Sequence, residues 1–275
     1  FKATESHPEF YIRRISEVEI ESSWKMICST AQVVLPRNIK DFNQNKVKDW
    51  FKRGDKVEIY LCYGLDEDLI LEFSGYIDKV SADYPITIKL EDEMWRLKQI
   101  PVNFASKDVK LKEFIQKFVT DYPIDIDSDV SLGAVRFSKV TLGEVLKKLQ
   151  DDFSLYSFIR NGKLTIAKPY SDVSEKIPVF DLERNCVSND LNYLSKEERT
   201  VKVIAESVQN FAKTKKKLKF ELGDPDPKTT INKTLSVTTL NDLQAEVRRI
   251  YDLYKKEGFD GSFTTFGTPS VQHGQ

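Results

Sequence analysis

The chain has 275 residues, 40% of them hydrophobic and 31% charged, and its formal net charge is -1. This length allows two or three domains with modest cores, and the near-neutral charge excludes a surface dominated by basic residues for nucleic acid or by acidic residues. No apolar run approaches the roughly 20 residues that cross a membrane, so we expect no membrane span. Cys28, Cys62 and Cys186 are too far apart in sequence for a disulfide framework or a zinc knuckle, and they suit a reducing compartment. The two histidines lie near opposite ends, so we expect no histidine-based catalytic or metal site and no cofactor.

The first 101 residues are predicted to be mostly β, with three strand signals in a row between Lys52 and Trp95. Apolar side chains at alternate positions put one face of the first and last of these strands in a core. They are Val57, Ile59, Leu61 and Tyr63, and then Ile86, Ile88 and Leu90. Gly75, inside the middle strand, indicates a bulge or a sharp bend, as a small closed or half-closed barrel needs. An extended stretch from Trp24 to Leu35 adds to these strands, which favours an antiparallel barrel or sandwich.

After this β region the hydrophobic period becomes that of a helix. Between Leu111 and Val119 the apolar residues follow an i, i+3, i+4, i+7, i+8 stripe. Thr141, followed three residues later by Glu144, forms a capping box that predicts the start of a second helix. The Asn161-Gly162 pair between two alternating apolar runs predicts a tight hairpin. These signals together predict a small α+β unit.

From Ile177 onwards the β character returns. The strand candidates are Val179–Leu182, Val187–Leu194, Arg199–Ser207, Lys215–Leu222 and Thr230–Val237. A third helix, over about 239–257, begins at Thr239, and Gly258 is expected to form its left-handed C-cap. The tail from Gly261 to Gln275 has strand and turn residues but no partner strand after it. We therefore expect the second β unit to be cut off before it closes.

The predicted fold class is α+β and β-rich. Two small antiparallel β-barrel domains, at residues 1–101 and 171–275, are separated by a small α+β insert at residues 102–170. The second barrel contains the helix at about 239–257 and is expected to be truncated at its C-terminus.

Four short motifs of structural residues fit this order of elements to a known family. They are Gly54-Asp55-x-Val57-x-Ile59, then Phe73-Ser74-Gly75-Tyr76-Ile77 with Val80, then Ile88-x-Leu90-Glu91-Asp92, and finally Gly261-Ser262-Phe263-Thr264-Thr265-Phe266-Gly267-x-Pro269-x-Val271-x-x-Gly274. In these motifs and in the order of its domains, the chain resembles the baseplate hub proteins of phage tails, of the late control protein D type. It also resembles the related N-terminal hub part of VgrG spike proteins. The resemblance spans nearly the whole chain.

The resemblance implies a structural protein that catalyses no reaction. Three subunits, each with two similar barrels, would form a pseudo-sixfold ring that joins a hexameric tail tube to a trimeric spike and lines the channel. The implied partners are further copies of the chain, the tail tube protein, the central spike or needle protein and the tape measure protein. The implied location is the virion, at the tail baseplate or tail tip, after assembly in the bacterial host cytoplasm.

The predicted subunit contact lies on the strand block of the first barrel, because closing a ring covers the edges and outer faces of such strands. Its residues are Val57, Ile59, Leu61, Phe73, Tyr76 and Ile77. The lysine run from Lys213 to Lys219 is interpreted as a charged edge strand that faces solvent. Within it, Lys215, Lys216 and Lys217 are candidates for charge that faces the channel or the tube. No sequence-specific nucleic acid is expected, because neither a base-reading helix nor an aromatic stacking platform accompanies the lysines.

Two other functions stay open. Trp24, Trp50 and Trp95, with the barrel loops, could grip a glycan or peptide in a monomeric binding module, although tryptophan more often packs in cores and interfaces. Glu91 or Asp92 could serve a glycoside hydrolase, but nothing else marks a sugar cleft, and the acidic stretch is expected to be solvated. The acidic turns at 66–68 and 224–227 lack calcium-loop spacing and are expected to be solvated too. No GxSxG, Walker A, GxGxxG or HExxH motif occurs, so we expect no enzyme.

Overall fold

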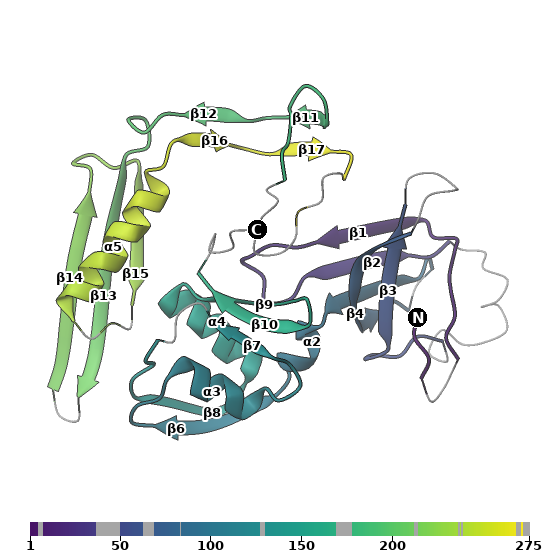
Figure 1. Cartoon of the computed structure of the whole chain (residues 1–275), viewed down its shortest axis with the longest axis horizontal. Helices are drawn as coiled ribbons and strands as arrows, with labels where there is room; N and C mark the ends of the chain where they lie inside the picture. Colours follow the sequence, from purple (N-terminus) through teal and green to yellow (C-terminus); the bar gives the residue numbers. More distant parts are fainter. Residues whose placement is uncertain are drawn as a thin grey trace. The chain divides into compact units, whose positions relative to one another are not determined.

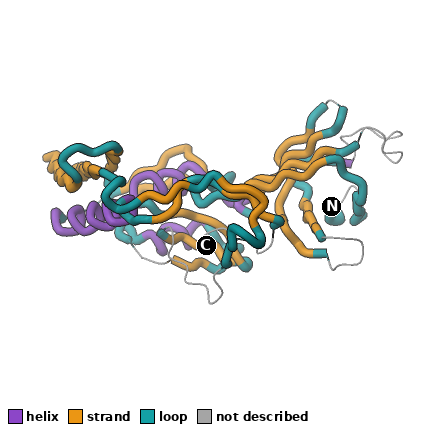
Figure 2. The backbone as a smooth tube through the Cα atoms, turned by 90° about the horizontal axis from the view of Figure 1, so that it is seen from above, coloured by secondary structure: helices purple, strands orange, loops and turns teal. Residues whose placement is uncertain are grey.

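The computed structural model describes residues 1–4, 8–36, 50–62, 69–82, 84–126, 130–168, 178–211, 214–235, 237, 239–267 and 271; for 208–211, 214–216 and 234, only the backbone is described. The chain divides into two compact units. The first contains Phe1–Lys147 and Tyr156–Pro169, and the second contains Lys148–Leu155 and Tyr170–His273. Strands outnumber helices (Figure 2), and the predicted β-rich α+β class is confirmed. The domain boundaries at residues 101 and 170 stay predictions.

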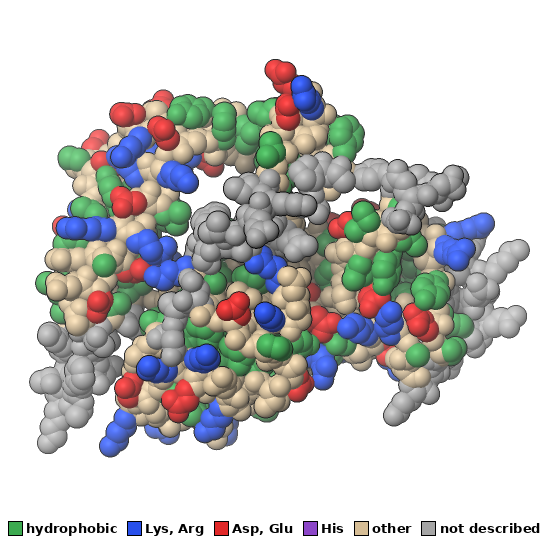
Figure 3. All heavy atoms as spheres, in the orientation of Figure 1, with side chains coloured by type: hydrophobic (Ala, Val, Ile, Leu, Met, Phe, Trp, Pro, Cys, Tyr) green, Lys and Arg blue, Asp and Glu red, His purple; other side chains and the backbone are tan. Residues whose placement is uncertain are grey.

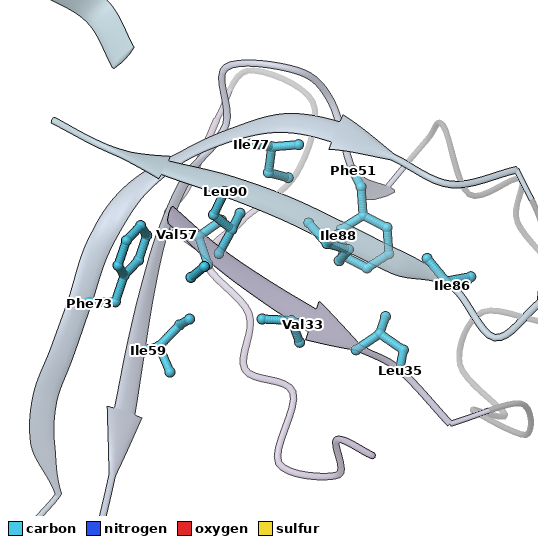
Figure 4. Packing of buried hydrophobic residues seen from close by; sticks show 11 residues of the cluster. Val33, Leu35, Phe51, Val57, Ile59, Phe73, Ile77, Ile86, Ile88 and Leu90 are labelled. Carbon is cyan, nitrogen blue, oxygen red and sulfur yellow. The ribbon is translucent and has the colours of Figure 1, made fainter. Parts of the chain in front are cut away.

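The first unit is built on a five-stranded sheet in which all neighbours are antiparallel. Its order is β1 (Glu17–Glu21), β2 (Thr30–Val34), β5 (Thr87–Asp92), β4 (Ile70–Val80) and β3 (Lys56–Leu61). The predicted alternation holds at most positions, because its apolar side chains are buried together in one cluster (Figure 4). The strand predicted from Trp24 begins only at Thr30. The preceding residues are turns, and the backbone N–H of Ser29 donates to the Asp92 carboxylate at 2.7 Å.

Gly75 marks a close approach of two backbones. It lies opposite Val57 on one side and Asp92 on the other, and a Cβ at this position would lie 2.1 Å from the Glu91 carbonyl oxygen. Only glycine fits such a separation. The register shifts in the two adjoining strand pairs fall nearby, between Ile59 and Tyr60 and between Ile77 and Lys79. The predicted irregularity is therefore real, with the glycine at the close contact and the bulges on either side of it.

The predicted insert contains two small sheets and two helices, α3 (Leu111–Phe118) and α4 (Leu142–Phe153), and the short helix α2 (Met94–Leu97) precedes it. β6 (Pro101–Ser106) pairs with β8 (Val135–Thr141), and β10 (Lys163–Ala167) lies between β7 (Ile124–Ile126) and β9 (Tyr156–Arg160). Both long helices and the β9–β10 hairpin were predicted.

Their local signals have the expected geometry. The backbone N–H of Glu144 donates to the Thr141 hydroxyl at 3.3 Å, and the N–H of Thr141 donates to the Glu144 carboxylate at 2.7 Å, which closes the capping box. Asn161 and Gly162 both have positive φ, at 51° and 71°, as the tight hairpin turn requires.

The second unit contains a three-stranded sheet covered on one face by α5 (Leu240–Tyr254) (Figure 1). β13 (Val201–Phe211) lies between β14 (Thr214–Gly223), which is antiparallel to it, and β15 (Thr229–Thr234), which is parallel. The parallel pair differs from the antiparallel arrangement that the sequence predicted. β14 lies between β13 and β15 in the sequence and runs antiparallel to β13. The connection after β14 reverses the chain again, so β15 runs in the same direction as β13. Leu243, Val247 and Ile250 of α5 pack in the same cluster as Val203 and Ala205.

Two short strand pairs complete the second unit and form what we call the ribbon. β11 (Cys186–Asn189) pairs with β17 (Phe263–Thr265), and β12 (Asn192–Leu194) pairs with β16 (Gly258–Asp260) (Figure 1). The C-terminal strands thus find their partners earlier in the chain, which the sequence did not reveal. Gly258 is the first residue of β16, so its prediction as a helix C-cap was wrong; the α5 C-cap is Lys255. The strand predicted at Val179–Leu182 is also absent from the described residues there, because Asp181 begins a hydrogen-bonded turn.

Candidate assembly surfaces

Five of the six predicted contact residues lie in the interior of the first unit. Val57, Ile59, Phe73 and Ile77 belong to the buried cluster of the sheet (Figure 4), and Tyr76 is also buried. Their apolar alternation reports packing within one subunit, so these five side chains offer no surface to another copy. Leu61 differs, with 39% of its surface exposed. A subunit contact at this strand pair stays a prediction, and of the six residues only Leu61 has an exposed side chain to make it.

The sheet nevertheless carries an apolar surface at the end of the same hairpin. β3 and β4 run on past Ile59 and Phe73, away from the rest of the core (Figure 4). There the register pairs Tyr60 with Leu71 and Leu61 with Ile70, and the side chains are exposed. We call the five exposed residues here the β3–β4 end: Tyr60, Leu61, Leu69, Ile70 and Leu71.

The sequence contained a signal for the β3–β4 end. Leu69-Ile70-Leu71 places three apolar residues in succession, which breaks the in–out alternation of a strand with one buried face. Leu69 and Ile70 are 65% and 57% exposed. Contiguous exposed apolar residues on a soluble protein mark sites of interaction.

The ribbon of the second unit is a second exposed apolar surface. Tyr193 and Phe259 face each other across β12 and β16 with ring centroids 5.6 Å apart, and both are exposed. Val187, Phe263 and Phe266 are exposed as well. Figure 3 shows hydrophobic side chains at the surface over β12 and β16. A two-stranded ribbon is marginally stable alone, so covering these side chains would stabilise it.

The predicted lysine strand is β14, at one edge of the three-stranded sheet. Lys217 and Lys219 are exposed, and the Lys217 ammonium lies 2.7 Å from the Glu206 carboxylate of β13. Lys202 and Glu221 form a second cross-strand ion pair at 3.6 Å. The face of the sheet away from α5 is therefore a charged, solvated surface. The side chains of Lys215 and Lys216 lie outside the described residues, and a channel-facing role for this strand stays a prediction.

The acidic stretch at the end of β5 joins neighbouring elements through its carboxylates. Glu91 pairs with Lys98. Asp92 accepts hydrogen bonds from the backbone N–H groups of Ser29, at 2.7 Å, and Met94, at 2.9 Å. Burial nevertheless raises the pKa of Asp92 to about 6. The carboxylates of Glu91 and Asp92 therefore bind neighbouring groups, whereas the sequence predicted a solvated strand end.

Glu93 binds three donors, one each from β3, β4 and the loop between α3 and β7. The Lys56 ammonium lies 2.8 Å from it, and the hydroxyls of Tyr122 and Tyr76 donate to it at 3.0 and 3.2 Å. Burial raises the pKa of Glu93, but the hydrogen bonds from Lys56 and Tyr122 outweigh burial and hold the pKa below its usual value. Glu93 therefore fastens Tyr122 of the predicted insert to the five-stranded sheet. Among the described residues, no group of three acidic, cysteine or histidine side chains is placed to hold a metal ion.

The three tryptophans have separate contacts. Trp24 meets Tyr156 edge-on at 4.5 Å between ring centroids, and Trp50 meets Phe10 in the same way at 5.4 Å. Trp95 stacks on Tyr76, and its indole N–H donates to Asp78 at 3.2 Å. These are packing contacts of the kind that tryptophan commonly makes.

Asp224 lies in one of the acidic turns that were predicted to be solvated. Its carboxylate accepts hydrogen bonds from Lys255 at 2.6 Å and from the Val201 N–H at 2.8 Å.

None of the helices in the described part of the chain is long and apolar enough to cross a membrane.

No family model matches the sequence, and no curated protein matched it in a sequence comparison. Solved structures do match the fold. The tail protein from Neisseria meningitidis MC58 aligns with 90% of this chain and 75% of its own, at a TM-score of 0.55 and 15% identity. The 43 kDa tail protein of prophage MuSo2 from Shewanella oneidensis aligns with 93% and 80%, at 0.50 and 13%. A chain of a PdpA–VgrG complex aligns with 82% of this chain and 45% of its own, at a TM-score of 0.40 and 12% identity. The chain shares its fold with phage tail proteins, as its resemblance to tail hub proteins predicted.

Proposed function

We propose that this chain is the structural hub of a phage or phage-like tail tip. Three copies form a pseudo-sixfold ring that joins the hexameric tail tube to a trimeric spike or needle and lines the channel. Its partners are other copies of itself, the tail tube protein, the spike and the tape measure protein. It resides in the virion tail, is assembled in the host cytoplasm and catalyses no reaction.

One observation carries the proposal. The fold likeness to tail proteins covers at least 90% of this chain, so it includes both units rather than one common small barrel. The exposed apolar surfaces of the β3–β4 end and the ribbon add support, since an assembled ring would cover them. The carboxylates of the β5 end bind structural partners, which fits a protein without catalysis.

The test is the mass of the purified chain in solution. Light scattering over a dilution series to high micromolar concentration is expected to give three times the chain mass of 31.8 kDa. Cryo-electron microscopy of the particles is then expected to show a threefold ring with a central opening. A chain that stays at 31.8 kDa at every concentration contradicts the trimer and favours a monomeric binding module.

A further inference from the structure

The outer face of the β6–β8 pair carries a hollow with two cations. Phe104 and Phe137 lie opposite each other in this pair, and their rings lie 5.2 and 5.5 Å, between centroids, from Phe114 of α3. Opposite residues share a face and successive residues alternate, so the next pair, Ala105 and Arg136, lies on the face away from α3. An open hollow of about 400 Å³ is lined by Ala105, Ser106, Lys107, Ala134, Val135 and Arg136.

The two cations occupy opposite corners of this hollow. The strand pairing ends at Ser106 with Val135, so Lys107 is the first residue beyond it. Continuing the alternation by one step sets Lys107 diagonal to Arg136, and diagonal neighbours are about 7–8 Å apart. An alanine lies opposite each cation, which leaves the space between the two long side chains open. An oxyanion held there can accept hydrogen bonds from both cations.

Neither cation has a partner in the described part of the chain. The side chains of Lys107 and Arg136 are exposed and take part there in no ion pair, hydrogen bond or ring contact. The carboxylate of Asp108, the next residue along the chain, accepts a hydrogen bond from the Ser131 hydroxyl at 2.8 Å. None of the residues that line the hollow is acidic. Its positive charge is therefore uncompensated, which favours an anion.

A second hollow with two cations, on the five-stranded sheet, provides a comparison. Lys79 and Lys89 lie directly opposite each other across β4 and β5, are exposed, and also have no partner among the described residues. That hollow is lined as well by the acidic residues Glu19, Glu21, Asp78 and Glu91. Their carboxylates repel an anion. Of these two hollows, the one on the β6–β8 pair is thus the one suited to bind it.

The lining indicates which kind of anion fits. Half of the lining residues are apolar, namely Ala105, Ala134 and Val135. They suit the methylene groups of an acidic side chain and an apolar neighbour, and arginine pairs with a carboxylate in a bidentate manner. A nucleic acid backbone would need a track of cations with aromatic side chains for stacking, and the lining contains neither.

We infer that this hollow binds the carboxylate of an acidic side chain, flanked by apolar residues, on a partner protein. Lys107 and Arg136 neutralise the carboxylate from two sides, and the alanines contact its apolar surroundings. The inference does not rest on the proposed ring.

The first test uses a fluorescein-labelled peptide of sequence Ala-Leu-Glu-Leu-Ala with an amidated C-terminus, and the same peptide with glutamine in place of glutamate. We expect the glutamate peptide to bind the wild-type chain saturably in fluorescence anisotropy. The glutamine peptide should have a dissociation constant at least about tenfold higher. Equal binding of the two peptides overturns the inference, and so does the absence of saturable binding up to millimolar concentration.

The second test removes the cations. Lys107→Gln with Arg136→Gln should raise the dissociation constant of the glutamate peptide by about tenfold or more, and the fold is retained because both side chains are exposed. Arg136→Lys keeps the charge but loses the planar fork, so an intermediate effect is expected. The matched control, Lys79→Gln with Lys89→Gln, removes the other exposed pair and should bind like the wild type. An equal loss in the control would mean general attraction to surface lysines and overturns the site.

Inorganic phosphate separates the two sources of an oxyanion. Phosphate should displace the peptide no better than chloride at the same ionic strength, because both then act only by screening. Displacement by phosphate at about tenfold lower ionic strength than chloride would overturn the assignment to a protein carboxylate. The mass of the chain in solution does not enter these measurements, so a monomeric wild type would contradict the proposed ring and leave this site standing.

Discussion

The five-stranded sheet and the ribbon have similar strand signals in the sequence, but they are stabilised differently. In the sheet, three of the five strands have a neighbour on each side, and the alternating apolar residues meet in one buried cluster (Figure 4). The ribbon strands have one neighbour each and leave Tyr193 and Phe259 exposed. Apolar alternation thus marks a strand without saying what covers it. In the sheet the cover is the same subunit, whereas the aromatic side chains of the ribbon are exposed in the described part of the chain.

The largest expected effect tests the covered side of this comparison. Ile77 is completely buried in the sheet, so Ile77→Ala should lower the free energy of unfolding of the first unit by about 2–5 kcal/mol. Leu71→Ala, in the same strand but exposed, should change it by no more than about 0.5 kcal/mol. Chemical denaturation followed by tryptophan fluorescence measures both. Equal effects of the two substitutions would contradict the boundary between the core and the β3–β4 end.

A pH titration should separate the two units. The pKa of Asp92 is raised to about 6, whereas an unfolded aspartate titrates near 3.9. Between these values the folded state holds a proton that the unfolded chain has lost, so the first unit loses about 3 kcal/mol of stability as the pH rises from about 4 to about 6. Denaturation at several pH values checks this, and Asp92→Asn should remove the slope. A slope that survives the substitution would assign it to another group.

The second unit should respond at lower pH. The hydrogen bond from Lys255 holds the pKa of Asp224 below its usual value. The stabilisation from Asp224 is therefore complete above the unfolded pKa near 3.9 and is lost as the pH falls through the lower folded value. Hydrogen exchange resolved by segment, at pH 6.5 and below 4, should show α5 losing protection only in the acid sample. Asp224→Asn should remove that acid loss.

Matched glycines test the backbone packing of each unit. A Cβ on Gly75 would lie 2.1 Å from the Glu91 carbonyl oxygen, and one on Gly223 would lie 2.4 Å from the Lys202 Cα. Each change to alanine should cost about 1–3 kcal/mol, because neighbouring strands must move apart. Limited proteolysis should show that Gly75→Ala loosens only the first unit and Gly223→Ala only the second. Loss of both units in either variant would contradict their independence.

The smallest expected effect concerns the joint of the ribbon. The Ser262 N–H and hydroxyl both donate to the Asp190 carboxylate, between the two strand pairs. Asp190→Ala should speed amide hydrogen exchange at Ser262 and in the strands beside it, with little change in global stability, because the site is exposed. Ser262→Ala keeps the backbone bond and should have a weaker effect. Unchanged exchange in both variants would show that the joint is held by strand pairing alone.

Local signals in the sequence predicted local structure well. The helical stripes, the Thr141–Glu144 capping box and the Asn161-Gly162 turn each specify geometry within a few residues, and the structure has them all. Non-local pairing was not readable. β17 pairs with β11 across more than 70 residues, and no periodic pattern encodes which strands meet.

The exposed β3–β4 end was missed for a different reason. Val57 and Ile59 have the same alternation that an interface strand would have, so the sequence could not separate a subunit core from a subunit contact. The run Leu69-Ile70-Leu71 did carry that distinction, because three consecutive apolar residues cannot all face one core. Gly258 was assigned to the helix end on residue type alone, whereas strand pairing with Leu194 decided its place.

The ribbon also has a kinetic consequence. Leu194 and Gly258 lie opposite each other in it, so the whole module of β13, β14, β15 and α5 is inserted between two paired residues. Its β13–β14 hairpin joins strands that are adjacent in sequence, while each ribbon pair closes a loop of more than 60 residues. Closing a long loop costs entropy that prior folding of its contents reduces. The module should therefore fold first and the ribbon strands should pair last. The aromatic residues of the ribbon then stay unpaired until the final steps of folding.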